Sequence, residues 1–211
     1  MLIYFHIPKC GGTTMLRWFE RLGLKIERGS SGLTEEAVKA QEIGADVLIG
    51  HVPYAGGYPT EMVTASMFRN PVEHALSAWF YGKSRWEKRT LQPFPLTIYQ
   101  SFDRPREEIN VLYKGLRQDN IQSRMINADN LPKLTWIGIL EEWDSSVDRM
   151  ATLINAEECL FAKYARYRMT HSFRPTAKHL PSGLLQRIEK NNEEDMDLYS
   201  DARRLFKERS W

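Results

Sequence analysis

The sequence contains little cysteine: only Cys10 and Cys159 occur among its 211 residues. Two cysteines do not make a disulfide framework, so an apolar core has to hold the fold together. A hydrophobic fraction of 42% over this length is enough to build such a core. The simplest prediction is one domain spanning residues 1–211, and nothing in the sequence indicates an oligomeric state.

Long apolar runs are also missing. No stretch approaches the roughly 18 consecutive apolar residues of a membrane-spanning helix. The first apolar run ends at Pro8, without a basic segment before it or a cleavage site after it. We therefore expect a soluble, cytoplasmic protein that has no membrane partner.

Neither sign of charge is in large excess, because 29 Lys and Arg residues face 27 Asp and Glu residues, for a net charge of +2. This charge is too small to indicate nucleic acid as a partner. An anion, if one binds, must be held by a local cluster of basic groups rather than by the field of the whole protein.

Strand-like and helix-like segments alternate along the chain. This alternation predicts an α/β fold with a central, mostly parallel sheet flanked by helices. Residues 27–34 and 91–105 are predicted to be connections without regular structure. The predicted strands are 2–6, 45–51, 64–69 and 134–140, and the predicted helices are 35–43, 72–80, 107–115, 120–126, 141–155 and 182–206, in addition to one that follows the first strand.

An anion-binding loop is predicted between the first strand and the first helix. Gly11 and Gly12 allow a phosphate to approach the backbone, and the N–H groups of the helix N-terminus point toward it. Lys9 adds a positive charge, while Thr13 and Thr14 add hydroxyl groups on the first turn. This combination suits the phosphate end of a nucleotide.

Cys10 allows two interpretations. Its neighbour Lys9 and the helix N-terminus would lower the pKa of the thiol, as in a reactive nucleophile. However, no base is adjacent in the sequence. A small side chain that packs beneath the loop is therefore the favoured interpretation.

Three basic residues follow predicted strands: Lys9, His51 and Arg69. The carboxyl ends of parallel strands meet at one rim of a sheet, where ligands bind in such folds. Arg69 and Ser77, two turns into the following helix, would together hold a second phosphate. The three strand ends therefore predict an active site for a nucleotide that is phosphorylated at two positions.

Two features of magnesium-dependent kinases are missing. The lysine precedes the glycines, which is not the order of a Walker A loop, and the second long apolar strand leads to Gly50 and His51 instead of an aspartate. A nucleotide-dependent phosphotransferase is thus disfavoured but remains the alternative enzyme. A nucleotide-binding protein without catalysis is a third class.

The motifs resemble those of the sulfotransferases that use 3′-phosphoadenosine 5′-phosphosulfate (PAPS), and within them the carbohydrate branch, which includes heparan sulfate 2-O- and chondroitin-type enzymes and bacterial relatives. The resemblance rests on I-P-K-C-G-G-T-T at Ile7–Thr14 and on R-N-P-V-E-H-A-L-S at Arg69–Ser77. Weaker support comes from Gly50–Pro53, Trp136–Trp143 and Asp197–Tyr199.

The resemblance implies a P-loop-like, three-layer α/β sandwich and a metal-free transfer from PAPS to a hydroxyl, leaving the product PAP. It implies catalytic roles for Lys9, which would neutralise charge on the transferring group, and for His51, the candidate general base. The acceptor would be a carbohydrate or another alcohol. The implied nucleotide-binding residues are Lys9, Cys10, Gly11, Gly12, Thr13, Thr14, Arg69 and Ser77.

Other basic segments have simpler interpretations. His6, within the first predicted strand, is expected to be a core histidine. Residues 85–118 match no motif. The basic residues between 83 and 89 would suit an anionic glycan or a nucleotide base, and a solvated basic face is an equally good interpretation. Residues 171–179 are cationic and have no firm role.

Overall fold

The computed structural model describes residues 1–29, 33–59, 61–112, 117, 119–156 and 174–209. The chain forms two compact units. Unit 1 comprises Met1–Arg69, Gln122–Arg168 and Leu198–Trp211, and unit 2 comprises Asn70–Ile121 and Met169–Asp197. Each unit has its own architecture, and the single domain expected over residues 1–211 remains a prediction.

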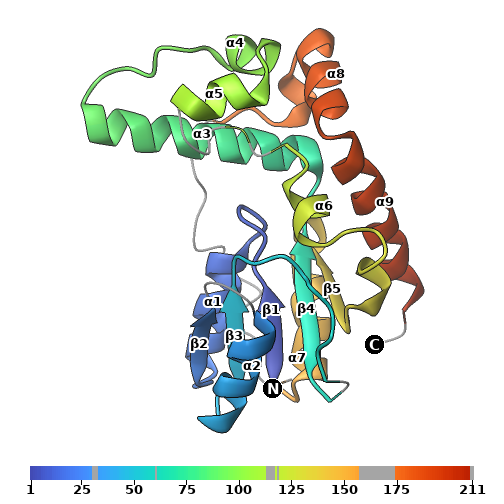
Figure 1. The fold of residues 1–211 in the computed structure, drawn as a ribbon. Coiled ribbons are helices and arrows are strands. Elements are labelled where there is room, and N and C mark those ends of the chain that lie inside the picture. Colours follow the sequence, from blue (N-terminus) through green and yellow to red (C-terminus); the bar gives the residue numbers. More distant parts are fainter. Residues whose placement is uncertain (30–32, 60, 113–116, 118, 157–173, 210–211) are drawn as a thin grey trace. The chain divides into compact units, whose positions relative to one another are not determined.

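Unit 1 contains a five-stranded sheet with the order β2-β3-β1-β4-β5, and every pairing between these strands is parallel (Figure 1). Parallel neighbours require crossover connections, which the helices between the strands provide. The predicted α/β fold with a central parallel sheet is confirmed. The strands are β1 Leu2–Phe5, β2 Ile26–Gly29, β3 Val47–Gly50, β4 Val63–Phe68 and β5 Trp136–Ile139.

Side chains on both faces of the central strands are buried. Leu2 and Tyr4 of β1 pack in a cluster with α1 (Gly12–Arg21) and α7 (Trp143–Leu153). The alternate side chains Ile3 and Phe5 are also buried, and the Phe5 ring contacts Tyr54, with 5.0 Å between ring centroids. Such burial on both faces is typical of a parallel sheet covered by helices on each side.

Strand β2 is a correction to the sequence analysis, which placed a connection at residues 27–34. Ile26 pairs with Val47, and the four-residue strand extends the sheet at its edge. Edge strands need no continuous apolar run, and Glu27 and Arg28 interrupt the apolar pattern here. Among the described residues, the other helical elements of unit 1 are α2 Leu33–Glu42, most of α6 Ile121–Met125, the short 3₁₀ turns η1 Leu131–Lys133 and η2 Leu140–Glu142, and the part of α9 Glu193–Glu208 that begins at Leu198.

Unit 2 is helical in its described residues. Its first helix, α3 (Pro71–Thr90), is twenty residues long, more than twice the predicted length. Asn70 caps it by accepting a hydrogen bond from the Glu73 N–H, at 3.1 Å. Helix α4 (Ile98–Asp103) lies where no regular structure was predicted, and it begins at a capping box of Thr97 and Gln100. The remaining elements are α5 Arg106–Leu112, η4 Ala177–His179 and α8 Ser182–Asn191.

The prediction of one helix over 182–206 is wrong, because α8 ends at Asn191 and α9 (Glu193–Glu208) begins after Asn192. The buried Asn192 side chain donates to the Ile188 carbonyl and accepts from the Asn120 N–H. These bonds satisfy backbone groups at the break, which the amphipathic pattern does not reveal. No helix within the described ranges is long and apolar enough to cross a membrane.

Candidate functional site

The loop after β1 has the backbone geometry of an anion site. The chain leaves the sheet at His6, whose N–H donates to the Gly50 carbonyl at 2.8 Å. Lys9 and Gly11 then adopt positive φ angles of 67° and 82°. Gly11 is the N-cap of α1 and has no side chain to accept from the helix N–H groups. The first N–H groups of α1, at Gly12 and Thr13, are therefore positioned for an external anion.

The two glycines of the loop are needed for different reasons. Gly11 has the left-handed conformation, and a Cβ there would lie 2.9 Å from Leu140 Cδ1. Gly12 is required by packing, because a Cβ would lie 1.9 Å from His6 Cδ2. The sequence analysis explained both by the close approach of a phosphate. For Gly12, the His6 ring is the neighbour that occupies this space.

Cys10 and Lys9 are each held by a hydrogen bond to a residue outside the loop. Cys10 is 1% exposed, and its thiol donates to Gln122 Oε1 at 3.7 Å. This burial agrees with a packing role for Cys10. The Lys9 carbonyl accepts a hydrogen bond from Arg69 Nη1 at 3.0 Å. The guanidinium thus helps to fix the loop at the residue with the unusual backbone angle.

Arg69, immediately after β4, is itself fixed by Gln122. The Arg69 N–H donates to Gln122 Oε1, and Gln122 Nε2 donates to the Arg69 carbonyl, both at 2.9 Å. Gln122 is fully buried and ties Cys10 and Arg69 to one amide. The sequence analysis missed this residue, since no motif marks a glutamine in a five-residue helix.

Ser77, the predicted partner of Arg69, lies on α3 in unit 2, and it is 3% exposed. Arg69 is the last residue of the first segment of unit 1. The two ends of this motif therefore belong to different units. Joint binding of a phosphate by Arg69 and Ser77 remains a prediction.

His51 follows β3 and is exposed, and His51 Nδ1 lies 2.7 Å from the His6 carbonyl oxygen. A carbonyl oxygen only accepts, so Nδ1 is the protonated nitrogen of the neutral ring. The lone pair of the neutral imidazole then resides on Nε2. His51 thus has the tautomer and the fixed orientation of a general base.

His6 is a second correction. It was expected inside the first strand as a core residue, but β1 ends at Phe5 and His6 stacks on His51, with 4.1 Å between ring centroids. Burial is the main cause that lowers the pKa of His6 to about 3, and the neighbouring His51 and Lys9 contribute to the same shift. His6 is consequently neutral near pH 7. Its position just after the first strand, as with Lys9 and His51, was the signal that the sequence offered.

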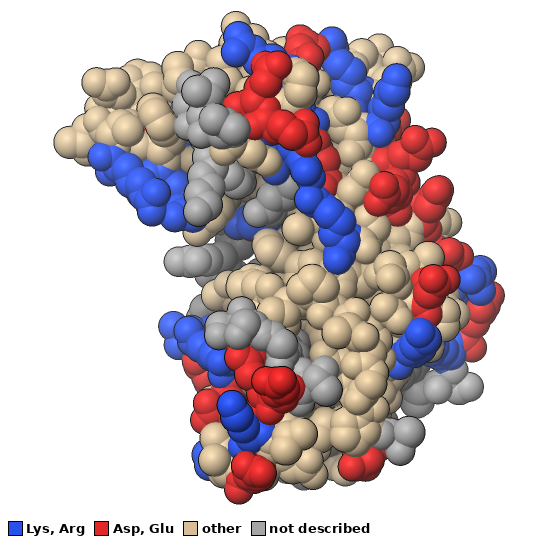
Figure 2. Space-filling model, viewed as in Figure 1, with Lys and Arg blue, Asp and Glu red and all other residues tan. Residues whose placement is uncertain are grey.

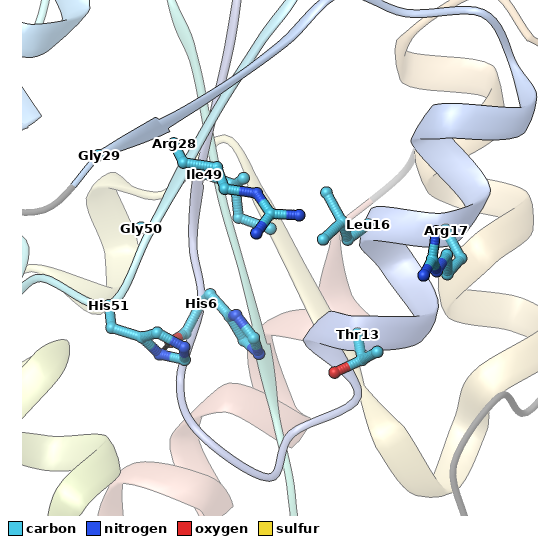
Figure 3. Close-up of a pocket in the computed structure, with 9 residues that line it drawn as sticks. All are labelled: His6, Thr13, Leu16, Arg17, Arg28, Gly29, Ile49, Gly50 and His51. Atoms are coloured by element: carbon cyan, nitrogen blue, oxygen red, sulfur yellow. Dashed lines mark hydrogen bonds between the residues drawn. The ribbon is translucent and has the colours of Figure 1, made fainter.

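His6, His51 and Thr13 border a cavity of about 530 Å³ at the carboxyl ends of β1, β2 and β3. In Figure 3, the Thr13 hydroxyl, the two histidine rings and the Arg28 guanidinium surround a common space, with Ile49 and Leu16 beside it. Such a mixture of an apolar wall and a few polar groups is typical of small-molecule sites. The described residues that line it are His6, Thr13, Leu16, Arg17, Arg28, Gly29, Ile49, Gly50 and His51.

The remaining predicted segments have structural partners where they are described. Arg174 pairs with Glu73 of α3 at 3.2 Å, and the Thr176 hydroxyl lies 2.9 Å from His179 Nδ1, so this part of 171–179 is anchored within unit 2. His171 and Cys159 lie outside the described residues. In the weaker motifs, the Tyr199 hydroxyl donates to Glu141 at 2.9 Å.

Residues 85–118, where described, comprise the end of α3, the helices α4 and α5, and the turns and bends beside them. Lys83, at the start of the basic stretch, pairs with Glu87 on α3. No group of three His, Cys, Asp or Glu side chains suited to a metal ion occurs among the described residues. Metal-free chemistry remains a prediction.

No protein-family model matches the chain, and no curated protein matches its sequence. Among solved structures, the chain is similar to the crystal structure of a sulfotransferase from Alicyclobacillus acidocaldarius, with 15% sequence identity and a TM-score of 0.46 over 94% of this chain and 98% of that chain. A similarity of this size says nothing about activity, which has to be argued from the site.

Proposed function

We propose that the protein is a sulfotransferase that moves a sulfuryl group from PAPS to an acceptor hydroxyl, with a carbohydrate as the expected acceptor. The hydrogen bond between His51 Nδ1 and the His6 carbonyl carries this proposal, because it leaves Nε2 as a base beside an uncapped helix N-terminus. A base and an anion site at one rim suit group transfer between an anionic donor and a hydroxyl.

The residues of the loop fit the 5′ end of such a donor. The N–H groups of Gly12 and Thr13 and the Thr13 hydroxyl are donors, and no acidic residue lies in the first turn of α1. Thr14 is 9% exposed and contributes its backbone to the turn, where its N–H donates to the Gly11 carbonyl. When bound, the donor supplies a sulfuryl group activated by its bond to a phosphate oxygen.

Each residue then has a defined task. His51 Nε2 takes the proton of the acceptor hydroxyl as the acceptor oxygen bonds to sulfur. Lys9 and the N–H groups of α1 offset the negative charge on the phosphate oxygen as its bond to sulfur breaks. A preorganised donor of this kind contributes about 3–4 kcal/mol to transition-state stabilisation. Arg69 and Ser77 are proposed to hold the 3′-phosphate.

A thermal-shift comparison of PAP with ATP·Mg²⁺ tests the nucleotide assignment. At 100 times its Kd, PAP should stabilise the fold by about 2.7 kcal/mol, and ATP·Mg²⁺ at the same concentration should have little effect. Stabilisation by ATP·Mg²⁺ without stabilisation by PAP would favour the alternative, a nucleotide-dependent phosphotransferase. The variant Lys9→Met serves as the control, because it should reduce the PAP effect if the loop is the binding site.

A further inference from the structure

One cation in the cavity has no task in the proposed chemistry. Arg28 lies in the edge strand β2, and no described acidic side chain pairs with it. Arg17 also lines the cavity, but it is paired with Glu20 at 2.7 Å. Arg28 is thus the cation whose charge is available to a ligand in this cavity.

The charge of the cavity differs from that of the surface in general. Basic and acidic side chains both occur over the face shown in Figure 2, in keeping with a net charge of +2. In contrast, none of the nine described lining residues is acidic, while two of them, Arg17 and Arg28, are arginines. A concave site lined by groups of one sign attracts ligands of the opposite sign.

The position of the cavity in the sheet separates it from the predicted 3′-phosphate. In the order β2-β3-β1-β4-β5, Arg69 follows β4 on one side of β1, whereas His51 follows β3 and Arg28 lies in β2 on the other side. A donor that spans the loop and Arg69 would extend toward β4. The space next to His51 and Arg28 then remains for the acceptor.

We propose that this cavity binds an acceptor that carries a carboxylate or sulfate group in addition to its reacting hydroxyl, and that Arg28 binds that anionic group. This inference rests on the proposed sulfotransferase activity. The planar guanidinium of arginine suits both anions because it donates two parallel hydrogen bonds. Figure 3 shows the Arg28 guanidinium on the same side of β3 as the His51 and His6 rings. The acceptor hydroxyl would lie at His51, and Ile49 and Leu16 would contact its apolar surface.

The test compares two sugars that share the same ring hydroxyls. The full chain is saturated with PAP, then titrated with methyl glucuronide or with neutral methyl glucoside, while the histidine ring signals are followed by ¹⁵N NMR. We expect the glucuronide to bind about tenfold more tightly, the effect of one charge-assisted hydrogen-bonded pair. Arg28→Gln should abolish this preference. Arg21→Gln, an exposed arginine of α1 outside the cavity, should retain it.

Equal binding of the two sugars by the wild-type protein, or binding of neither, would contradict the proposal, as would a preference that persists in Arg28→Gln. A loss of PAP affinity in Arg28→Gln would assign this arginine to the donor instead. The PAP saturation step keeps the two ideas apart: failure of PAP to bind the wild-type protein refutes the proposed function, whereas normal PAP binding without a glucuronide preference refutes only the role of Arg28.

Discussion

The two predicted phosphate-binding motifs, Ile7–Thr14 and Arg69–Ser77, fold in different ways. The first lies entirely in unit 1, and its backbone is fixed by positive φ angles at Lys9 and Gly11 and by a hydrogen bond from Arg69. The second begins in unit 1 and continues into unit 2. The first motif therefore folds as one loop within one unit. The second motif is a series of residues that each have a separate local role.

Those local roles are visible in the second motif. Asn70 caps α3, and Pro71 occupies the first turn, where its missing N–H leaves no bond unmade. Glu73 pairs with Arg174. We therefore expect substitutions in the first motif, the loop, to have larger effects than substitutions in the second motif.

The largest effect is expected for Gly12→Ala, which disturbs the loop itself. The added Cβ would overlap the His6 ring, so the ring must move out of its stack with His51. We expect a loss of about 1–3 kcal/mol in the free energy of unfolding, as for overpacking of a buried site. Urea denaturation measures this change.

Two further variants locate the cause of that loss. Combined with His6→Ala, the Gly12→Ala substitution should cost much less, because the overlapping ring is gone. Gly183→Ala in α8 is the matched control, since a Cβ there meets no atom within 4 Å. An equal cost for Gly12→Ala with and without His6 would show that the ring is not the reason for this glycine.

A smaller effect, on nucleotide affinity, is expected for Arg69→Ala. Comparing two nucleotides shows which role of Arg69 causes it. If Arg69 binds a 3′-phosphate, the variant should lose about tenfold in affinity for PAP and little for adenosine 5′-phosphate, which lacks that group. If Arg69 only fixes the Lys9 carbonyl, both ligands should bind more weakly by the same factor. Calorimetric titration of both nucleotides separates the two roles.

Ser77→Ala extends this comparison into unit 2. Loss of preference for PAP over adenosine 5′-phosphate in both variants would mean that the second motif acts as one site after all. A preference that is lost in Arg69→Ala but unchanged in Ser77→Ala would remove Ser77 from the nucleotide site.

The sequence predicted the sheet and the loop because both depend on local patterns. The buried strand 47–50 is an unbroken apolar run, and the loop needs only a glycine at a left-handed position before a helix. Strand β2 escaped prediction because its partner, β3, supplies the pairing that its own charged residues do not indicate. The break at Asn192 depends on a distant backbone group, the Asn120 N–H, and therefore has no local signal.

Site residues could be predicted from the sequence only where the side chain itself suggests a function, as a basic residue after a strand does. Lys9 and His51 follow strands and are basic, which was enough to place them at the rim. Gln122 is neutral and lies on a short helix, and its role exists only because the fold brings it to both Cys10 and Arg69. Arg28 was hidden because the strand that carries it was not recognised.

The last expected effect is a pH dependence of stability that belongs to the loop and comes from His6. Because the pKa of His6 is about 3 in the folded protein and 6.5 is the ordinary value, the unfolded chain binds a proton in this range that the folded protein does not. The free energy of unfolding should therefore fall as the pH falls from 6.5 toward 3, by at most about 1.4 kcal/mol for each pH unit.

His6→Phe keeps an aromatic ring against His51 but cannot titrate, so its stability should change less over the same range. Urea denaturation of both proteins between pH 7 and pH 4.5 measures the difference. Parallel curves would contradict this prediction, because they would show that His6 binds protons in the folded state as readily as in the unfolded chain.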